Sequence, residues 1–450
     1  MAREGLRLLT AAESARFAAQ HPVSATLAEE ARRVWRGGVP LHWMADWASP
    51  TPIFASRGCG ARLIDADGRA YEDFCLGDTP AMFGHGDARL AEALAAQARR
   101  GTGFMLPSTD AVAVGRLLAA RFGLPLWQAA TSATDANRAA IRWARAVTGR
   151  DRILVFDGCY HGAVDDTFVT LASGSPGMKA GLVGQVHDVA AAARVIPFND
   201  PDALASALAQ GDVAAVLAEP AMTNCGMILP DPGFHDALRD LTRRAGTLLV
   251  IDETHTLSAG PGGYTSAHGL EPDILTVGKA IAGGVPAAVW GVTADLARRM
   301  DEAQARVGPG YSGIGTTLSG NALAMAAMRV MLEEVMSEAA YAHMLAGAER
   351  LVAGLRAVIA RRGVGWSAVQ AGARVELIFA DPPPRDAAGM RAALDHDLLA
   401  AFHLWLINRR VLIAPFHNMM LVSPVTEDSQ IDRLVEAVDG FAAALEGAAA

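Results

Sequence analysis

The alternation of helical and strand-like segments from about residue 85 onward constrains the fold of this chain most strongly. Three segments have the apolar spacing expected of helices: residues 110–122, 134–147 and 233–245. Three short apolar or β-branched runs alternate with them: residues 153–156, 213–218 and 247–251. This alternation predicts an α/β fold with a mostly parallel sheet and helices on both faces. Ligands of such sheets bind beyond the carboxyl ends of the strands, so residues that follow each run are candidates for a site.

The two ends of the chain have other patterns. Residues 11–36 are expected to form one or two helices, and residues 61–71 a hairpin around Asp67-Gly68. Residues 320–362 are strongly helical in pattern and lead to strand candidates at Val375–Phe379 and Val411–Ala414. We therefore expect a smaller α+β domain beside the large one. The expected organisation has three parts: an N-terminal segment of the small domain (residues 1–75), the large domain (76–325) and the C-terminal small domain (326–450).

Composition excludes several classes of function. The chain has 450 residues and a net charge of −9, which argues against a nucleic-acid or anionic-membrane surface. No apolar run reaches the roughly 18 residues of a membrane-spanning helix, and no signal-peptide pattern is present. The cysteines have no metal-ligand spacing, so we expect no metal and a cytoplasmic protein with reduced thiols; they are Cys59, Cys75, Cys159 and Cys225.

Lys279 is the residue best suited to covalent chemistry. It follows an apolar run, lies among small residues and precedes Gly283-Gly284. An amine in such dry, cramped surroundings is more easily kept uncharged, as Schiff-base formation requires. Asp252 ends the preceding strand-like run, where a buried carboxylate would need a cationic partner such as a protonated ring nitrogen. The pair indicates pyridoxal phosphate. The alternatives are a surface lysine in a loop and a helix-capping aspartate.

Two hydroxyl-rich segments that each precede a helix are candidate phosphate sites. They are residues 131–138, with Ser132, Ala133 and Thr134, and residues 315–321, with Thr316 and Thr317. Backbone N–H groups and the positive end of a helix dipole favour an anion there. Plain helix capping is an equally ordinary explanation of both segments.

An aromatic residue and a histidine follow the run at residues 153–156. Tyr160 is able to stack on a flat cofactor ring. His161 is next to it, although a lone histidine is more often structural than catalytic. Glu219 follows the run at residues 213–218 in the same manner. Each of these residues is therefore a candidate for the same edge of the sheet as Asp252.

The motifs together resemble those of the class III pyridoxal-phosphate-dependent aminotransferases of fold type I. The resemblance spans roughly residues 50–435. Within the class, the chain looks closest to the branch that holds glutamate semialdehyde aminomutase and β-amino acid transaminases. It implies a mostly parallel, seven-stranded type of sheet and a homodimer with active sites at the interface. The motifs that carry it are Asp65–Gly68, Gly84–Gly86, Ser132–Asn137, Tyr160–Gly162, Glu219-Pro220, Asp252-Glu253, Pro272-Asp273, Gly278-Lys279, Gly283-Gly284 and Thr317–Asn321.

The resemblance implies a role for each matching residue. Lys279 would form the Schiff base and shuttle a proton, Asp252 would bind the ring nitrogen, and Tyr160 would stack on the ring. Ala133 and Thr134 would bind the phosphate, and Thr317 would reach the phosphate of the neighbouring subunit. The full set of implied cofactor-binding residues is Ser132, Ala133, Thr134, Tyr160, His161, Glu219, Asp252, Thr254, Lys279, Thr316 and Thr317.

Three departures from the family pattern bear on the substrate. Ala133 and Asp135 stand where the family has glycine and glutamate. Thr254 replaces a valine that packs on the ring, and an uncommon histidine, His255, follows it. The aminomutase branch carries a carboxylate-binding arginine near residues 38–44, where this chain has none. We expect Trp43, Met44 and Trp47 to line a more apolar substrate pocket there. Arg374 is the candidate for a carboxylate-binding fork supplied by the other domain.

The expected activity is that of an aminotransferase with a small-molecule amino donor and acceptor and ping-pong kinetics. The alternatives are an intramolecular aminomutase of the glutamate semialdehyde type, which the absent arginine disfavours, and a pyridoxal-phosphate-dependent racemase or decarboxylase. A non-catalytic cofactor-binding regulator is a further alternative. Such a protein would usually lack the lysine or carry a DNA-binding module, and this sequence keeps Lys279 without a basic helix-turn-helix segment.

Overall fold

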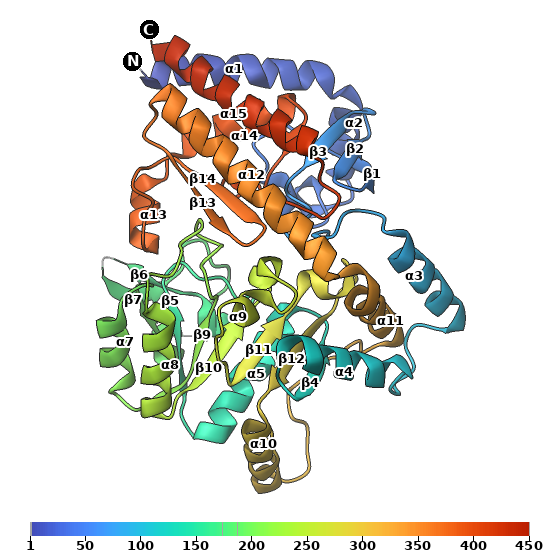
Figure 1. Ribbon diagram of the computed structural model, residues 1–450, viewed down its shortest axis with the longest axis vertical. Coiled ribbons are helices and arrows are strands. Elements are labelled where there is room, and N and C mark those ends of the chain that lie inside the picture. The colour runs from blue at the N-terminus through green and yellow to red at the C-terminus, as the bar shows by residue number, and fades with distance from the viewer. Residues whose placement is uncertain (1, 173, 187, 450) are drawn as a thin grey trace. The chain divides into compact units, whose positions relative to one another are not determined.

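The computed structural model describes residues 2–172, 174–186 and 188–449, which fall into two units (Figure 1). The larger unit comprises Ala88–Tyr341 and Pro384–Ala392. The smaller unit combines the N-terminal segment up to Asp87 with Ala342–Pro383 and the segment from Ala393 onward. The N-terminal segment therefore belongs with the C-terminal third of the chain.

The larger unit is built on one mixed sheet. Its strands are β4 (Leu126–Ala130), β5 (Arg152–Phe156), β8 (Ala193–Ile196), β9 (Val213–Ala218), β10 (Leu248–Asp252), β11 (Ile274–Val277) and β12 (Ala288–Val292). Among the described residues the sheet has seven strands in the order β4-β12-β11-β10-β9-β5-β8. The pairs from β11 through β8 are parallel, and β12 is antiparallel to both of its neighbours. The expected α/β fold with a mostly parallel sheet is confirmed.

Burial explains why the central strands are apolar throughout. Every residue of β9, β10, β11 and β12 is buried, as expected of strands covered on both faces. Helices lie alongside these strands in Figure 1; α5 contacts β9, β11 and β12, and α8 contacts β10. The helices of this unit are α3 (Ala88–Arg100), α4 (Asp110–Phe122), α5 (Ala133–Thr148), α6 (Val189–Ala192), α7 (Pro201–Leu208), α8 (Phe234–Ala245), α9 (Gly263–Ala267), α10 (Ala294–Val307), α11 (Ala322–Val330) and α13 (Ala387–Ala393).

Helix α5 has clear local reasons for its bounds. The Ser132 hydroxyl accepts the Asp135 N–H as an N-cap, at 3.2 Å. Gly149 ends the helix in the left-handed conformation with φ +66°, which glycine adopts readily. The helix predicted over residues 134–147 is thus present with one more residue at each end. The helix predicted over residues 110–122 is α4, with the same bounds.

The smaller unit contains two further sheets and long helices. One sheet has the order β1-β2-β3-β15 and the other β13-β14-β16. The strands are β1 (Ala55–Cys59), β2 (Arg62–Asp65), β3 (Ala70–Asp73), β13 (Ser367–Ala371), β14 (Arg374–Ile378), β15 (Val411–Leu412) and β16 (Met419–Leu421). The helices are α1 (Ala2–Gln20), α2 (Pro22–Ala31), α12 (Glu338–Arg362, which begins in the larger unit), α14 (His396–Asn408) and α15 (Asp428–Ala449). In the larger unit, β6 (Val169–Ala172) and β7 (Ser175–Met178) form an antiparallel hairpin.

Several local predictions for the two chain ends are confirmed, with changed bounds. Strands β2 and β3 are antiparallel across the Asp67-Gly68 turn, as the hairpin prediction requires. The N-terminal helical segment begins earlier than expected, at Ala2. The helical stretch at residues 320–362 is interrupted by a π-helical turn at Met331–Val335. No single periodicity reveals such an interruption.

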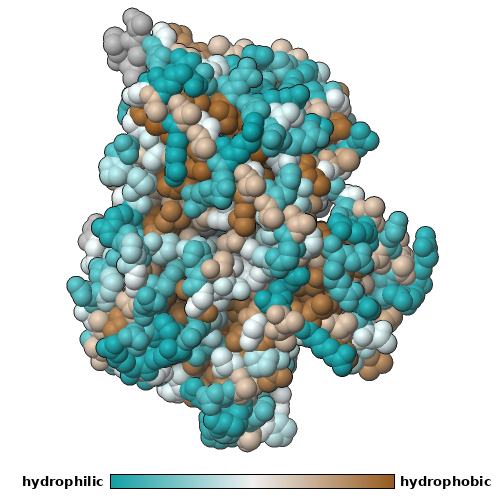
Figure 2. Space-filling view, viewed as in Figure 1, coloured by the Kyte–Doolittle hydropathy of each residue, from teal (hydrophilic) through white to brown (hydrophobic). Residues whose placement is uncertain are grey.

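Polar and apolar side chains are interspersed on the face drawn in Figure 2. Within the described ranges, no helix combines the length and apolar character that a bilayer crossing requires. Each of the cysteines is a free thiol, and no group of three or more acidic, histidine or cysteine side chains among the described residues has a metal-binding arrangement.

Candidate active site

Three neighbouring parallel strands bring the candidate residues of the larger unit together. Asp252 is the last residue of β10, Glu219 directly follows β9, and Lys279 lies two residues beyond β11. Because these strands are adjacent and parallel, their carboxyl ends meet at one edge of the sheet. Lys279 has φ +49°, a left-handed conformation that is uncommon for a residue other than glycine. Such a backbone is retained where the surrounding structure requires the side chain in one direction.

The Asp252 carboxylate is buried and held by three donors. Asn137 Nδ2 donates to Oδ2 at 2.8 Å, the Thr254 N–H donates to Oδ1 at 3.1 Å, and His161 Nδ1 lies 3.0 Å from Oδ2. Burial by itself would raise the pKa of Asp252, but His161 and the other donors hold that pKa well below its usual range. Asp252 therefore stays ionised in a site closed to water.

His161 is the charged counterpart of Asp252. Burial by itself would lower the pKa of His161, yet its hydrogen bond and attraction to the Asp252 carboxylate contribute to raising that pKa to about 10. The imidazole is buried at 1 % exposure. A structural role was the more ordinary expectation for a lone histidine, and the geometry makes His161 a support for Asp252.

Asn137 belongs to the Ser132–Asn137 motif, but sequence reasoning assigned it no role of its own. Its amide also donates to the His161 carbonyl at 3.1 Å and accepts from Thr276 Oγ1 at 2.9 Å. The side chain is fully buried on α5, one turn beyond Ala133. A buried asparagine at that spacing from a phosphate-site segment was the available signal, because buried amides need partners.

The start of α5 is packed directly against the turns that carry Lys279 and His161. A Cβ added at Gly278 would lie 2.8 Å from Ala133 Cβ. A Cβ added at Gly162 would lie 2.1 Å from Thr134 Oγ1 and 2.8 Å from Thr134 Cα. The Thr134 hydroxyl accepts the Ala163 N–H at 3.1 Å. In the first turn of α5 the Asp135 N–H is capped by Ser132, whereas the N–H groups of Ala133 and Thr134 have no acceptor within the helix and are therefore suited to an anion.

The other hydroxyl-rich segment lies close to this helix start. Thr316 Oγ1 is 3.4 Å from Thr131 Oγ1, and Ser319 Oγ lies 3.1 Å from the Thr316 N–H. Thr317 is exposed. Tyr160 is half exposed at the same edge of the sheet, whereas Thr254 is buried and its hydroxyl has no hydrogen-bond partner in the described structure.

Lys279 does not lie alone. Its Nζ contacts His255 Nε2, and His255 Nδ1 lies 2.6 Å from Thr223 Oγ1. Thr223 Oγ1 donates to Glu219 Oε2, and Asn224 Nδ2 donates to Glu219 Oε1 at 2.9 Å. The sequence marked His255 as unusual but gave no partner for it, because Thr223 is 32 positions away in the chain.

A lysine, an ionised buried aspartate and a helix start whose N–H groups suit an anion are thus gathered in one place. The family model described as aminotransferase class-III matches residues 43–436, most of the chain. The chain belongs to the class-III aminotransferases. The expected family is therefore confirmed, and the fold of the large unit agrees with it.

Relatives within the class-III family carry two kinds of name. The chain is 36 % identical to a glutamate-1-semialdehyde 2,1-aminomutase of Thermomicrobium roseum, over 92 % of this chain and 96 % of that one. A crystal structure of a glutamate-1-semialdehyde-aminomutase from Pseudomonas aeruginosa PAO1 is 46 % identical, with a TM-score of 0.96 and coverage of 98 % and 99 %. An omega-transaminase from Sphaerobacter thermophilus is 30 % identical, with a TM-score of 0.85 and coverage of 95 % and 98 %.

The class-III assignment confirms the expected cofactor, pyridoxal 5′-phosphate, and the residues present fit it. The ionised Asp252 suits a protonated ring nitrogen. The start of α5 offers N–H groups to a phosphate, and a Cβ at Gly162 would displace Thr134 there. When bound, the cofactor withdraws electrons from the carbon that bears the amino group and so makes its proton more acidic.

The four candidate substrate residues of this class-III chain lie in the smaller unit. Trp43 and Met44 are partly exposed in a 3₁₀ turn at His42–Ala45. Met44 and Trp47 line a cavity of about 310 Å³ within that unit. Arg374 is the first residue of β14 and is 1 % exposed, with its guanidinium on Thr79 Oγ1 and on Met419 Sδ at 3.4 Å. Their part in substrate binding stays a prediction.

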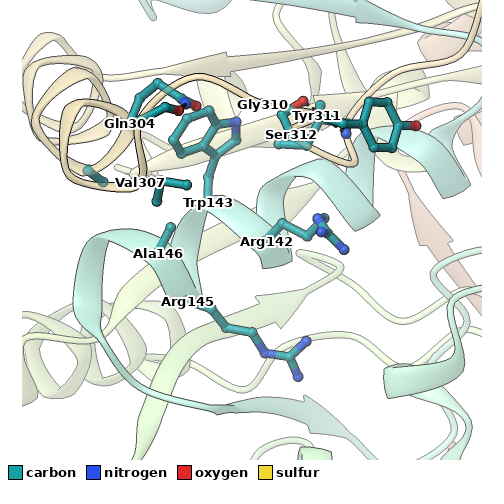
Figure 3. A pocket seen from close by; sticks show the side chains of 12 residues that line it. Arg142, Trp143, Arg145, Ala146, Gln304, Val307, Gly310, Tyr311 and Ser312 are labelled. Atoms are coloured by element: carbon teal, nitrogen blue, oxygen red, sulfur yellow. Dashed lines mark hydrogen bonds between the residues drawn. The ribbon is translucent and has the colours of Figure 1, made fainter.

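A cavity of the larger unit lies apart from the catalytic candidates. The cavity has a volume of about 440 Å³. Figure 3 shows it between α5 and the segment that follows α10, with Trp143 and Arg142 on the helix and Tyr311 on the loop. None of Lys279, Asp252 and His161 lines it. The candidate active site therefore lies at the strand ends and not in this cavity.

Proposed function

We propose that this class-III enzyme is an intramolecular aminomutase, which moves an amino group between neighbouring carbons of one amino-aldehyde substrate. The names of the relatives support this reading, because the matches to glutamate-1-semialdehyde aminomutases cover over 90 % of both chains. The single structural observation that carries amino-group chemistry is the position of Lys279 one strand away from the ionised Asp252. The proposal thus follows the alternative expected from the sequence, an aminomutase, and not the main expectation, an aminotransferase.

The proposed roles follow from the contacts of each residue. Lys279 would anchor the cofactor through its amine and move the proton of the substrate carbon. Asp252, with His161 and Asn137 behind it, would keep the ring nitrogen protonated. Tyr160 would cover the ring from its half-exposed position. The phosphate-binding residues proposed are Ser132, Ala133, Thr134, Thr316 and Thr317, with Thr254 and Glu219 beside the ring.

Transfer between two separate substrates is the second candidate, and one observation favours it. Residues 38–44 contain no arginine to bind a substrate carboxylate. The similarity to an omega-transaminase supports the same candidate. In this case a donor would leave its amino group on the enzyme before the acceptor enters, which produces ping-pong kinetics.

Product analysis of the holoenzyme distinguishes the two candidates. With glutamate-1-semialdehyde as sole substrate, we expect the isomer that has its amino group on carbon 1, detected by NMR without any second substrate. Turnover that requires a separate amino donor would replace the aminomutase proposal with the transaminase. Lys279→Ala is the control and should lower the rate by about 10²–10⁴-fold. Failure of borohydride to attach the cofactor to Lys279 would overturn both candidates.

We further propose a homodimer in the cytoplasm. Two segments of the larger unit, residues 102–106 and 311–322, expose large apolar side chains. A hydrogen bond of 3.0 Å from the Ala322 N–H to the Thr102 carbonyl links the end of the second segment to the start of the first. Their most exposed members are Met105 at 83 %, Leu106 at 74 %, Tyr311 at 89 % and Leu318 at 63 %. Apolar surface of this kind is typical of an interface. The free thiols suit a reducing compartment.

A further inference from the structure

Four side chains form a continuous hydrogen-bonded chain that starts at the reactive amine. Lys279 Nζ contacts His255 Nε2, His255 Nδ1 lies 2.6 Å from Thr223 Oγ1, and Thr223 Oγ1 donates to Glu219 Oε2. His255, Thr223 and Glu219 are exposed by only 6 %, 0 % and 5 %. Water is therefore excluded from the links beyond the lysine.

The fold holds these residues in place from three strand ends. Glu219 follows β9, His255 lies in the turn after β10, and Lys279 follows β11. Thr223 lies in the loop after β9, which is closed by two hydrogen bonds of 3.0 Å between Met222 and Ile228. The second oxygen of Glu219 is fixed by Asn224 Nδ2. The loop that carries Thr223 and the carboxylate of Glu219 are thus each fixed by further hydrogen bonds.

The number of hydrogens on each side chain determines which group donates and which accepts in each of these hydrogen bonds. A threonine hydroxyl has one hydrogen, and Thr223 gives it to the Glu219 carboxylate. Thr223 Oγ1 must then accept from His255 Nδ1–H, which leaves a lone pair on Nε2. That lone pair faces Lys279 Nζ, so the lysine is the donor. Every link has one donor and one acceptor, and the chain ends on a carboxylate.

We propose that His255, Thr223 and Glu219 form a proton relay that takes a proton from Lys279 and returns it. The inference rests on the proposed function, because only amino-group chemistry makes Lys279 alternate between ammonium and free amine. His255 touches the reacting amine, whereas Thr223 and Glu219 act through it as positioning residues.

The proposed step is balanced in protons and charge. The Lys279 ammonium gives one proton to His255 Nε2, His255 Nδ1 gives its proton to Thr223 Oγ1, and Thr223 gives its own to Glu219 Oε2. The product state has a neutral amine, a neutral imidazole in its other tautomer and a protonated carboxyl. All hydrogen bonds are then reversed in direction and none is lost, so the same path returns the proton.

The surroundings of Glu219 suit the end of such a relay. Burial raises the pKa of Glu219, while the charge of His161 and the hydrogen bonds from Thr223 and Asn224 oppose that shift. The Asp252 carboxylate raises it further. A carboxyl group that is more easily protonated than usual is able to hold the transferred proton.

A structural role for His255 is the competing explanation, and substitutions at Thr223 distinguish the two. Thr223→Val removes the hydroxyl but keeps the volume, so the relay is broken while His255 stays packed. Thr223→Ser keeps the hydroxyl and is the matched control. Glu219→Gln removes the final acceptor and provides a second break if the valine variant does not fold.

The first readout is the rate at which the full-length, cofactor-free protein attaches pyridoxal phosphate to Lys279 near neutral pH, followed by absorbance. Free amine reacts and ammonium does not. We expect this rate to fall by at least roughly tenfold in Thr223→Val and in Glu219→Gln, because the lysine must then lose its proton without the relay. Thr223→Ser should keep the wild-type rate.

The second readout is the solvent deuterium isotope effect on capture of pyridoxal phosphate by the same proteins. We expect it to fall in both relay-breaking variants and to persist in Thr223→Ser. An unchanged rate of cofactor capture in both folded variants would overturn the relay. Absence of a borohydride-stable link between cofactor and wild-type Lys279 would instead overturn the proposed function, so the two failures are distinguishable.

Discussion

His161 Nδ1 and Asp252 Oδ2 lie 3.0 Å apart in the buried core of the larger unit, although the two residues are 91 positions apart in the chain. The pair connects the turn after β5 to the end of β10. Because burial would separately favour the neutral form of each group, the pair is stable as an ion pair only while both partners are present. This dependence makes its contribution to stability measurable.

The pair should make stability fall at alkaline pH. The pKa of His161 is about 10 in the folded protein against an ordinary 6.5, so its contribution is complete below about pH 6.5 and disappears as the pH rises to about 10. Urea unfolding of the cofactor-free protein should show a loss of up to about 1.4 kcal/mol per pH unit in this range. His161→Gln keeps a hydrogen-bond donor without the charge and should flatten the slope. Equal slopes in both proteins would contradict the assignment.

The same pair should matter at acid pH in the opposite sense. The pKa of Asp252 is lowered from its ordinary 3.8, so its contribution is present above that pH and is lost only as the pH falls below it. Asp252 therefore adds no slope in the alkaline range. This separation assigns the alkaline loss to His161.

Asn137 should be needed for the stability of the larger unit. Asn137→Ala leaves one donor to the Asp252 carboxylate missing and Thr276 Oγ1 without its acceptor. We expect a loss of about 1–3 kcal/mol in the free energy of unfolding, because these groups remain buried. Thr148→Ala on the same helix is the control, since the Thr148 hydroxyl forms hydrogen bonds only with backbone groups of Ala144 and Arg150, which are close in the chain. A loss no larger than that of the control would contradict the bridging role.

Gly162 should be required for binding of the cofactor phosphate. Gly162→Ala places a Cβ 2.1 Å from Thr134 Oγ1, which must move the start of α5. Gly149→Ala is the matched control: its φ of +66° resembles the +83° of Gly162, but nothing lies within 4 Å of the added atom. Both should lose about 1–2 kcal/mol of stability through the left-handed backbone.

Cofactor titration followed by fluorescence should separate the two glycine variants. We expect the Kd for pyridoxal phosphate to rise at least roughly tenfold in Gly162→Ala, equivalent to about 1.4 kcal/mol, and to stay near wild type in Gly149→Ala. Equal Kd values would show that the close approach of Gly162 to Thr134 has no part in binding the cofactor.

The apolar segment around Met105 should hold two copies of the chain together. Met105→Glu introduces a charge into that surface, and charged residues are depleted at the centre of an interface. Sedimentation should show monomer for this variant and dimer for the wild type. Val183→Glu is the control, because Val183 is 98 % exposed in a different segment. A wild-type monomer, or equal dissociation by both substitutions, would exclude this surface as the interface.

Local patterns were sufficient for much of the fold and for the proposal of Lys279 as the reactive lysine. The apolar run at residues 213–218 is strand β9 with the same bounds, and residues 110–122 are helix α4. Periodicity encodes these elements because each depends on neighbouring side chains along one segment. The positions of Asp252 and Lys279 after their strands followed from the same reasoning, together with the need of a buried carboxylate for a partner.

The sequence by itself thus determined the α/β class, the order of the elements, and the choice of Lys279 and Asp252 as candidates. Only the tertiary structure decided what surrounds them. Asn137 meets Asp252 across 115 positions, and His255 meets Thr223 across 32. Such contacts depend on which strands become neighbours and on how the turns beyond them pack. No periodicity within a single segment carries that information, because it belongs to the free energy of the whole packed unit.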